Sequence, residues 1–187
     1  GGSNENKMLS YFGRVNYSFM DRYLLEANLR TDGSSRFHKD HRWGIFPSFS
    51  AGWRINQEAF MQDVSWINNL KLRASWGMLG NINNVGDYDY FSTYQQGGNY
   101  NFEDGVVNGI QEAKPANTTL GWEKVTITDV GLDFSIFNGL IDFTGDYYNK
   151  VTNDILLGYN VPYEVGIYKD FKPSQNIGSV SNKGIEF

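Results

Sequence analysis

The stretch that decides the fold is Ser10–Phe19, SYFGRVNYSF, and a second stretch of the same kind, YLLEANLR, follows at Tyr23–Arg30. In both, apolar and polar residues alternate, so an extended chain has one apolar side and one polar side. Val15 falls on the apolar side of the first stretch, and Arg14 and Asn16 fall on the other. A run of about ten residues is longer than the five or six usual in soluble domains and matches a tilted membrane-spanning strand. The pattern predicts an all-β fold, an antiparallel transmembrane β-barrel.

The same alternation recurs along the chain and predicts six strands and the start of a seventh. Beyond the first two, the expected strands are Trp43–Ile55, Leu70–Gly77, Trp122–Phe137, a sixth that begins at Ile141, and a seventh that begins at Lys183. Short connections follow the first, third and fifth strands, and long ones follow the others. The long ones are Asp32–Arg42, Met78–Gly121 and Gly158–Asn182. Short periplasmic turns and long extracellular loops are typical of membrane barrels.

Two local irregularities are expected within this pattern. The segment Asn56–Trp66 carries apolar residues at helix-like spacing, which predicts a short interfacial turn with Asn56 as its N-cap. In the fifth strand the apolar phase changes after Ile127, which predicts a β-bulge near Thr128 and Asp129.

The dipeptide Asn138-Gly139 is a strong hairpin signal, because both central residues of a type I′ turn need positive φ. A two-residue turn here pairs apolar with apolar residues on one face, as register requires. The expected pairs are Ile136 with Ile141, Phe134 with Phe143, Val130 with Tyr147, Ser135 with Asp142, Asp133 with Thr144, and Gly131 with Asp146.

The composition fits this interpretation and excludes other classes. The 187 residues include 12 Tyr, 13 Phe and 5 Trp, and aromatic girdles flank the apolar band of membrane barrels. An aromatic belt is expected at the periplasmic rim, from Phe19, Tyr23, Trp53, Trp66 and Phe137. The absence of cysteine excludes disulfides and thiolate metal sites, and a net charge of −5 gives no basic surface for nucleic acid. An aromatic-rich soluble sandwich is the structural alternative.

Six strands cannot close even the smallest natural membrane barrel, which needs eight. We therefore expect residues 1–187 to be part of one larger barrel domain, with both ends of the chain internal to that domain.

Several motifs, taken in order, resemble the barrel of the SusC/RagA family, the TonB-dependent outer-membrane transporters of Bacteroidetes. They are Asp32–Phe37 (DGSSRF), Arg42–Ile55 (RWGIFPSFSAGWRI), Leu70–Ser75 (LKLRAS), Gly80-Asn81, Trp122-Glu123, Gly131–Asp133 (GLD), Asp146–Lys150 (DYYNK) with Thr152 and Asp154, and Asn182–Glu186 (NKGIE). The resemblance implies a 22-stranded barrel with an N-terminal plug, a SusD-like surface lipoprotein as lid, and import of oligosaccharides or peptides driven by TonB. The plug, the TonB box and the C-terminal closing strands are absent from this chain, so it corresponds to a middle portion of the barrel wall.

The polar faces of the strands are expected to line the lumen, or to contact the plug, with charges of uneven sign. The basic residues are Arg14, Arg30, Arg54, Lys71 and Arg73, and the acidic residues are Asp133, Asp142 and Asp146. In the long loop, Tyr88, Tyr90, Tyr94 and Tyr100 offer flat amphipathic surfaces that suit contact with a ligand or with the lid. Loop packing is the other interpretation of these tyrosines.

Sites of other chemistry have weaker support. His38 and His41 lack a helix that would bring them to one metal, and Asp87, Asp89, Glu103 and Asp104 lack the spacing of a calcium loop. Asp142 and Asp146 are expected on one strand face about 7 Å apart, which would suit an inverting glycosidase, although in a barrel wall they are more simply lumen residues. The chain has no Gly-x-Ser-x-Gly elbow and no P-loop, so we expect neither enzymatic activity nor a cofactor.

Two function classes follow. The first is a wall segment of an outer-membrane transporter, with lipid, ligand, lid and TonB as partners. The second is a secreted β-rich domain that binds or cleaves glycans, in which protein or water would cover both faces of the sheet.

Overall fold

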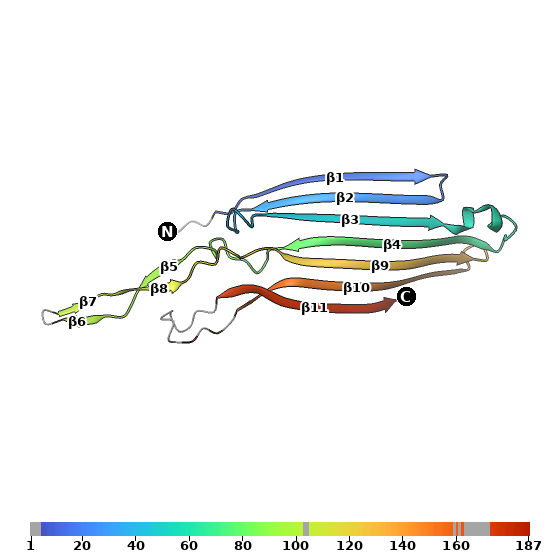
Figure 1. The fold of residues 1–187 in the computed structure, drawn as a ribbon. Helices are drawn as coiled ribbons and strands as arrows, with labels where there is room; N and C mark the ends of the chain where they lie inside the picture. Colours follow the sequence, from blue (N-terminus) through green and yellow to red (C-terminus); the bar gives the residue numbers. More distant parts are fainter. Residues whose placement is uncertain (1–4, 103–104, 159, 161, 163–172) are drawn as a thin grey trace.

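A computed structural model describes residues 5–102, 105–158, 160, 162 and 173–187 (Figure 1). Seven strands form one sheet in the order β1-β2-β3-β4-β9-β10-β11, and every neighbouring pair is antiparallel. Their bounds are β1 Met8–Phe19, β2 Tyr23–Ser34, β3 Trp43–Arg54, β4 Ile67–Asn81, β9 Glu123–Ile136, β10 Ile141–Gly158 and β11 Ser174–Glu186. The fold class expected from the sequence is confirmed.

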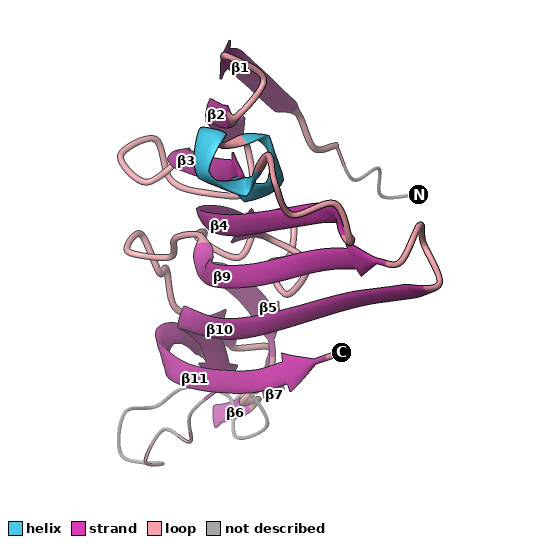
Figure 2. Ribbon diagram, turned by 90° about the vertical axis from the view of Figure 1, so that its right-hand side faces the viewer, coloured by secondary structure: helices cyan, strands magenta, loops and turns pink. Residues whose placement is uncertain are grey.

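The connections fall at two different ends of the sheet. The β1–β2, β3–β4 and β9–β10 connections lie at one end, the short-connection rim, and the longer ones lie at the other end, the long-loop rim (Figure 1). Viewed nearly along the strands, the sheet twists and stays open, with β1 and β11 at its two edges (Figure 2). In the part of the chain that the structure describes, no helix is long and apolar enough to cross a membrane.

The predicted alternation of faces is confirmed by the strand register. Val15 lies beside Ala27, and Ala27 lies beside Phe49, so apolar residues share one side of the sheet, the outer face. Arg14 lies beside Asn28 on the opposite side, the lumen face. The outer-face side chains are bare in this open sheet, and Val15 is 69% exposed. A surface of this kind is stable against lipid and not against water.

Several strands are longer than predicted, because ladder hydrogen bonds continue through residues that look like loop in the sequence. β2 continues to Ser34, which pairs with Met8, so the loop expected at Asp32–Arg42 is too long. β4 extends at both ends beyond Leu70–Gly77. β11 begins at Ser174 and not at Lys183, because its polar residues pair with the end of β10.

The predicted bulge near Thr128 and Asp129 is wrong. β9 pairs without a break with β10, and its only register shift with β4 lies at the short-connection rim. Val125 and Ile127 lie on the lumen face with Asp129, so the apolar phase changes although the backbone stays regular. The irregularity lies on β10 instead, where the register with β11 shifts between Thr152 and Leu156 and Asp154 has φ of 58°.

Asn56 is not an N-cap. The segment forms two 3-10 turns, η1 (Ile55–Gln57) and η2 (Ala59–Met61), and the side chain of Asn56 lies within the first. Its amide donates to the Asn68 carbonyl at 3.2 Å and accepts from the Leu70 N–H at 3.3 Å. Asn56 therefore fastens the turn to the start of β4.

The hairpin at Asn138-Gly139 is confirmed, with all six predicted pairs in register. Asn138 and Gly139 have φ of 58° and 82°, as a type I′ turn requires. The Leu140 N–H closes the turn on the Phe137 carbonyl at 3.2 Å. On the outer face the rings of Phe134 and Phe143 stack with centroids 5.1 Å apart.

A small core lies at the long-loop rim, where the loops fold over the lumen face of β3. Its buried residues are Phe37, Phe46, Val85, Leu120 and Trp122. A Cβ on Gly44 or Gly80 would come within 2.4 Å or 2.2 Å of the Phe46 ring, so these glycines leave room for Phe46. The sheet itself has no second layer among the described residues, and its stability depends on the ladder and on what meets its outer face.

The two faces give a first prediction for the full-length protein that contains this chain. Val15→Arg is expected to reduce folded protein in the membrane more than Asn16→Arg, because an arginine on the lipid side costs about 2–4 kcal/mol near the midplane. Heat-modifiable migration on gels of outer-membrane fractions measures the folded fraction. Equal tolerance of the two changes would contradict the assignment of the faces.

Candidate functional site

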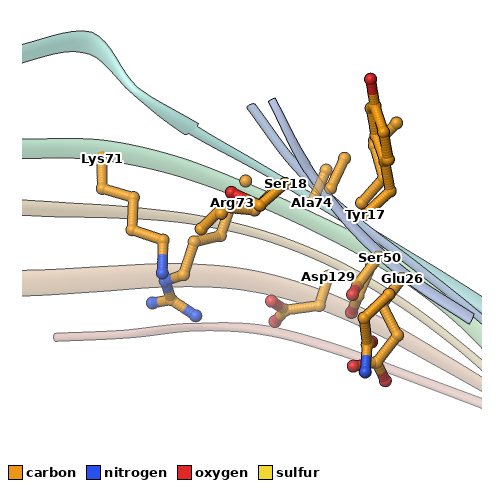
Figure 3. Close-up of a pocket in the computed structure, with 14 residues that line it drawn as sticks. Tyr17, Ser18, Glu26, Ser50, Lys71, Arg73, Ala74 and Asp129 are labelled. Atoms are coloured by element: carbon orange, nitrogen blue, oxygen red, sulfur yellow. The ribbon is translucent and has the colours of Figure 1, made fainter. Parts of the chain in front are cut away.

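An open hollow crosses five strands, β1–β4 and β9, and its lining on the lumen face includes Asn16, Glu26, Lys71, Arg73 and Asp129. Figure 3 shows Lys71, Arg73 and Asp129 projecting from one side of the sheet, while Tyr17 projects from the other. Cations and anions thus share one open surface, which can hold water or another polar chain segment.

An ion cluster centred on Arg73 is the tightest feature of this face. Its guanidinium donates to both carboxylate oxygens of Asp133, at 2.8 and 3.1 Å, and to Asp146 Oδ1 at 2.8 Å. The Thr144 hydroxyl donates to Asp133 as well, at 3.2 Å. The cluster ties β4, β9 and β10 together on the lumen side.

Gly131 makes this cluster possible. It lies on β9 directly between Arg73 on β4 and Asp146 on β10. A Cβ at Gly131 would lie 2.1 Å from Asp146 Oδ1 and 2.7 Å from the Arg73 guanidinium. Any side chain at Gly131 would separate the two charges. The ion pair between Arg73 and Asp146 can cross β9 because Gly131 contributes no side chain there.

The other predicted lumen charges lie apart from the cluster. Arg14 donates to Asn28 at 2.8 Å, and Arg30 pairs with Asp32 at 2.7 Å. Arg54 turns to the short-connection rim, where it lies 3.6 Å from Asp21.

Lys71 lines the hollow beside Arg73, and Asp142 is exposed opposite Ser135. Three of the eight predicted residues therefore come together: Arg73, Asp133 and Asp146. Contact of any of the eight with a plug stays a prediction.

The separation of about 7 Å expected between Asp142 and Asp146, which would suit an inverting glycosidase, is wrong. Four residues of extended strand separate Asp142 from Asp146, which is about 13–14 Å at 3.4 Å per residue. That separation exceeds the 6.5–9.5 Å of inverting enzymes, and Asp146 is already engaged by Arg73.

The loop acids lie next to cations. Asp87 accepts from Arg36 at 2.9 Å, and Asp89 pairs with Lys114. His38 lies 3.2 Å from Asp40. Glu103 and Asp104 lie outside the described residues. Among the residues described, no three His, Asp or Glu side chains gather in a way that would hold a metal ion.

The four loop tyrosines divide into two pairs. Tyr90 packs on Phe91 near the rim, with centroids 4.2 Å apart, and Tyr88 lies near the same ring at 6.4 Å but is 46% exposed. Tyr94 and Tyr100 are 68% and 64% exposed.

The exposed pair lies on a projecting hairpin arm, of which residues 93–102 and 105–114 are described, and which extends away from the sheet (Figure 1). The arm comprises β5 (Thr93–Gln96), β6 (Tyr100–Phe102), β7 (Gly105–Val107) and β8 (Ile110–Lys114). β5 pairs with β8 and β6 pairs with β7.

Glu123 joins the rim segments, a role that the sequence analysis did not predict. Its side chain is 3% exposed and accepts hydrogen bonds from Asn81 at 2.7 Å and Asn84 at 3.2 Å. The Leu156 N–H, next to the bulge of β10, donates to the same carboxylate at 2.9 Å. The sequence shows only that this acid follows the aromatic Trp122; its burial, which charged residues rarely show without partners, is evident only in the folded chain.

Glu58 performs a similar role at the short-connection rim and was also missed. Its carboxylate accepts from Tyr23 at 2.7 Å, from Trp53 at 2.9 Å and from Arg22 at 3.2 Å. The hydrogen bond from Tyr23, then that from Trp53, hold the pKa of the Glu58 carboxyl below its ordinary value. Two predicted girdle aromatics thus share one acceptor, which the sequence places in a loop.

The fold and its two faces define a segment of a membrane β-barrel wall, and comparisons with known proteins give the family. Residues 2–187 match the family described as "TonB dependent receptor-like, beta-barrel". The TonB-dependent receptor SusC of Bacteroides thetaiotaomicron is 43% identical over 185 residues, which are 97% of this chain and 18% of SusC. The TonB-dependent receptor P26 of Formosa agariphila is 39% identical over 186 residues, again 97% of this chain and 18% of the relative.

Solved structures agree. The RagAB peptide transporter superposes with a TM-score of 0.80 at 31% identity, over 96% of this chain and 19% of that one. The siderophore receptor PirA of Pseudomonas aeruginosa shares the fold alone, with a TM-score of 0.60 at 13% identity.

The chain therefore belongs to the TonB-dependent receptor family and, within it, to the SusC/RagA group, as its motifs predicted. Proteins of this family are outer-membrane barrels of Gram-negative bacteria, and they are transporters and not enzymes. The chain spans less than a fifth of the length of the curated relatives described above.

The Arg73 cluster gives a second prediction. Gly131→Ala in the full-length protein is expected to lower stability by about 1–3 kcal/mol, because the added Cβ must displace Asp146 or Arg73. Urea-induced unfolding in detergent measures the loss. Gly13→Ala on β1 is the matched control, since a Cβ there has nothing within 4 Å. Equal midpoints for the two variants would show that the cluster does not depend on Gly131.

Glu58 gives a third prediction, with a defined pH dependence. Because its pKa is lowered by folding, the stabilisation is present above the ordinary value of 4.5 and is lost as the pH falls through the folded-state pKa. Glu58→Gln is expected to be less stable than the wild type at pH 7, with a gap that narrows below about pH 4.5. Thermal unfolding across this pH range measures the gap; a gap that stays constant would exclude the ionised carboxylate as its source.

Proposed function

We propose that this chain forms part of the wall of an outer-membrane transporter that imports oligosaccharides or peptides together with a SusD-like lipoprotein. In this proposal the remainder of the protein supplies the plug, the TonB box and the strands that close the barrel. The long-loop rim is extracellular and the short-connection rim is periplasmic. The membership in the SusC/RagA group and the 31% identity to a peptide transporter support the assignment.

The observation that carries the proposal is the contrast between a rigid rim and an exposed arm. The rim is fixed by the small core and by Glu123, whereas the arm presents bare aromatic and aliphatic side chains beyond it. Its exposed apolar residues include Tyr94, Tyr100, Phe102, Val106, Val107 and Ile110. Large apolar side chains held in the open by a short hairpin suit binding to another surface.

The rim also shows which part of the long loop is available for binding. Val85 belongs to the core, and Asn84 holds Glu123, so residues 82–92 support the rim itself. Thr93 pairs with Lys114, and Lys114 is fixed to Asp89, so the arm has a defined base. The arm, and not the whole loop from Met78 to Gly121, is the segment we assign to ligand or lid contact.

Removal of the arm tests this proposal. In the full-length transporter, residues 94–113 are replaced by Asn-Gly, a two-residue turn that can join paired strands. We expect the barrel to assemble normally, because the core and Glu123 are retained, while ligand uptake or lid affinity falls. Gel mobility measures assembly, and labelled-ligand uptake and lid pull-down measure function.

Point variants act as controls for the deletion. Tyr94→Ser and Tyr100→Ser together remove exposed rings from the arm, and Tyr90→Ser removes a ring that packs on Phe91 at the rim. The arm variants should lower uptake or lid binding with no loss of assembly. Unchanged uptake and unchanged lid affinity in the deletion would show that the arm is only a surface excursion.

A further inference from the structure

One row of register partners crosses the whole outer face and changes character along the way. On the first four strands the row consists of apolar residues: Val15, Ala27, Phe49 and Trp76. On the last three strands the same row continues with polar residues: Thr128, Asn149 and Lys183. The apolar outer residues of β9 and β10 lie nearer the short-connection rim, where Phe134 stacks on Phe143, with the exception of Val151, which lies between Thr126 and Ser181.

Strand tilt explains this change. Strands of membrane barrels tilt by about 35–45° and lie about 4.8 Å apart, so a row perpendicular to them climbs by about 3 Å per strand. Six steps from β1 to β11 raise the row by about 18 Å, which exceeds half of the apolar band of about 25 Å. If Val15 lies near the midplane, Lys183 lies above the hydrocarbon on the side of the long loops.

The outward polar residues at this level form one surface, the outer polar patch. It consists of Lys124, Thr126, Thr128, Asn149, Asn153, Ser179, Ser181 and Lys183. The Ser179 hydroxyl donates to Asn153 at 2.8 Å, which links β10 and β11 across the patch. Lys124 lies 3.3 Å from Asp154, whose backbone forms the bulge of β10. With two lysines and this one aspartate, the patch carries a net positive charge.

We propose that the outer polar patch binds the headgroups of outer-leaflet lipids that carry both phosphate and sugar hydroxyls. The patch is continuous with the lipid-facing apolar surface below it, so the acyl chains of a bound lipid can lie along the outer face. Lys183 and Lys124 supply cations for phosphate. The exposed hydroxyls of Thr128 and Ser181 offer donors and acceptors that match sugar hydroxyls.

This inference rests on the proposed placement in the outer membrane, and its test separates the two. The full-length wild type, the double variant Lys124→Gln/Lys183→Gln and the control Lys150→Gln are expressed and fractionated. Lys150 pairs with Ile127 and Asn182 on the lumen face at the same height, so the control removes one charge from the opposite side. A wild type absent from the outer-membrane fraction would contradict the placement itself.

Native mass spectrometry of the recovered proteins then tests the patch. Each detergent-solubilised protein is titrated with a bis-phosphorylated diglucosamine lipid and, separately, with phosphatidylcholine. The wild type and Lys150→Gln should retain the phosphorylated glycolipid in preference, and the double variant should bind it about tenfold more weakly. Equal retention by all three proteins, or equal retention of both lipids by the wild type, would overturn the proposal. A change in oligomer mass without a change in bound lipid would assign the patch to protein contact and overturn it as well.

Discussion

The ladder of backbone hydrogen bonds between neighbouring strands is the interaction on which the rest of this structure depends. In hydrocarbon each unpaired backbone group costs several kcal/mol, so a chain that crosses by strands must pair them all. A single sheet layer with one face in lipid has almost no interior, and among the residues that the structure describes the buried apolar ones are five at the long-loop rim. The side chains therefore do not hold a core together; they determine which face meets lipid and fasten the ends of the ladder.

The two rims are fastened in the same way by different residues. At each rim one shielded carboxylate gathers donors from segments distant in sequence: Glu58 binds Tyr23 and Trp53, and Glu123 binds Asn81 and Leu156 N–H. A carboxylate accepts up to about four hydrogen bonds, so one acid can satisfy several donors where the ladder ends. Between the rims the charges are exchanged: one cation, Arg73, binds two carboxylates, those of Asp133 and Asp146, beside Gly131.

The sequence predicted those features that repeat along the ladder. Period-two alternation gave both faces, and Asn138-Gly139 gave the hairpin register down to the pairing of Phe134 with Phe143. It did not predict features that depend on contacts between distant segments. The change of apolar phase after Ile127 predicted a bulge in the backbone, whereas Val125 and Ile127 are apolar residues of the lumen face on a regular strand. Asn56 precedes a segment with helix-like spacing, which predicted an N-cap. Its actual hydrogen-bond partner, the Leu70 N–H on β4, is distant in sequence and could not be read from the local pattern. Glu58 resembles an ordinary turn acid, and Glu123 an ordinary polar residue at a strand end, until the chain is folded.

This division between ladder and rim also explains where binding surfaces can arise. The ladder fixes every side chain of the wall to one of two environments, so a change in the wall alters assembly before it alters binding. Beyond the rim that constraint ends. The arm is attached at its base by the pairing of Thr93 with Lys114 and by the ion pair between Lys114 and Asp89. Exposed rings such as Tyr94 and Tyr100 can therefore vary without cost to the sheet. Apolar side chains that stay exposed there, with neither lipid nor core around them, are the feature that supports the proposed contact of the arm with another molecule.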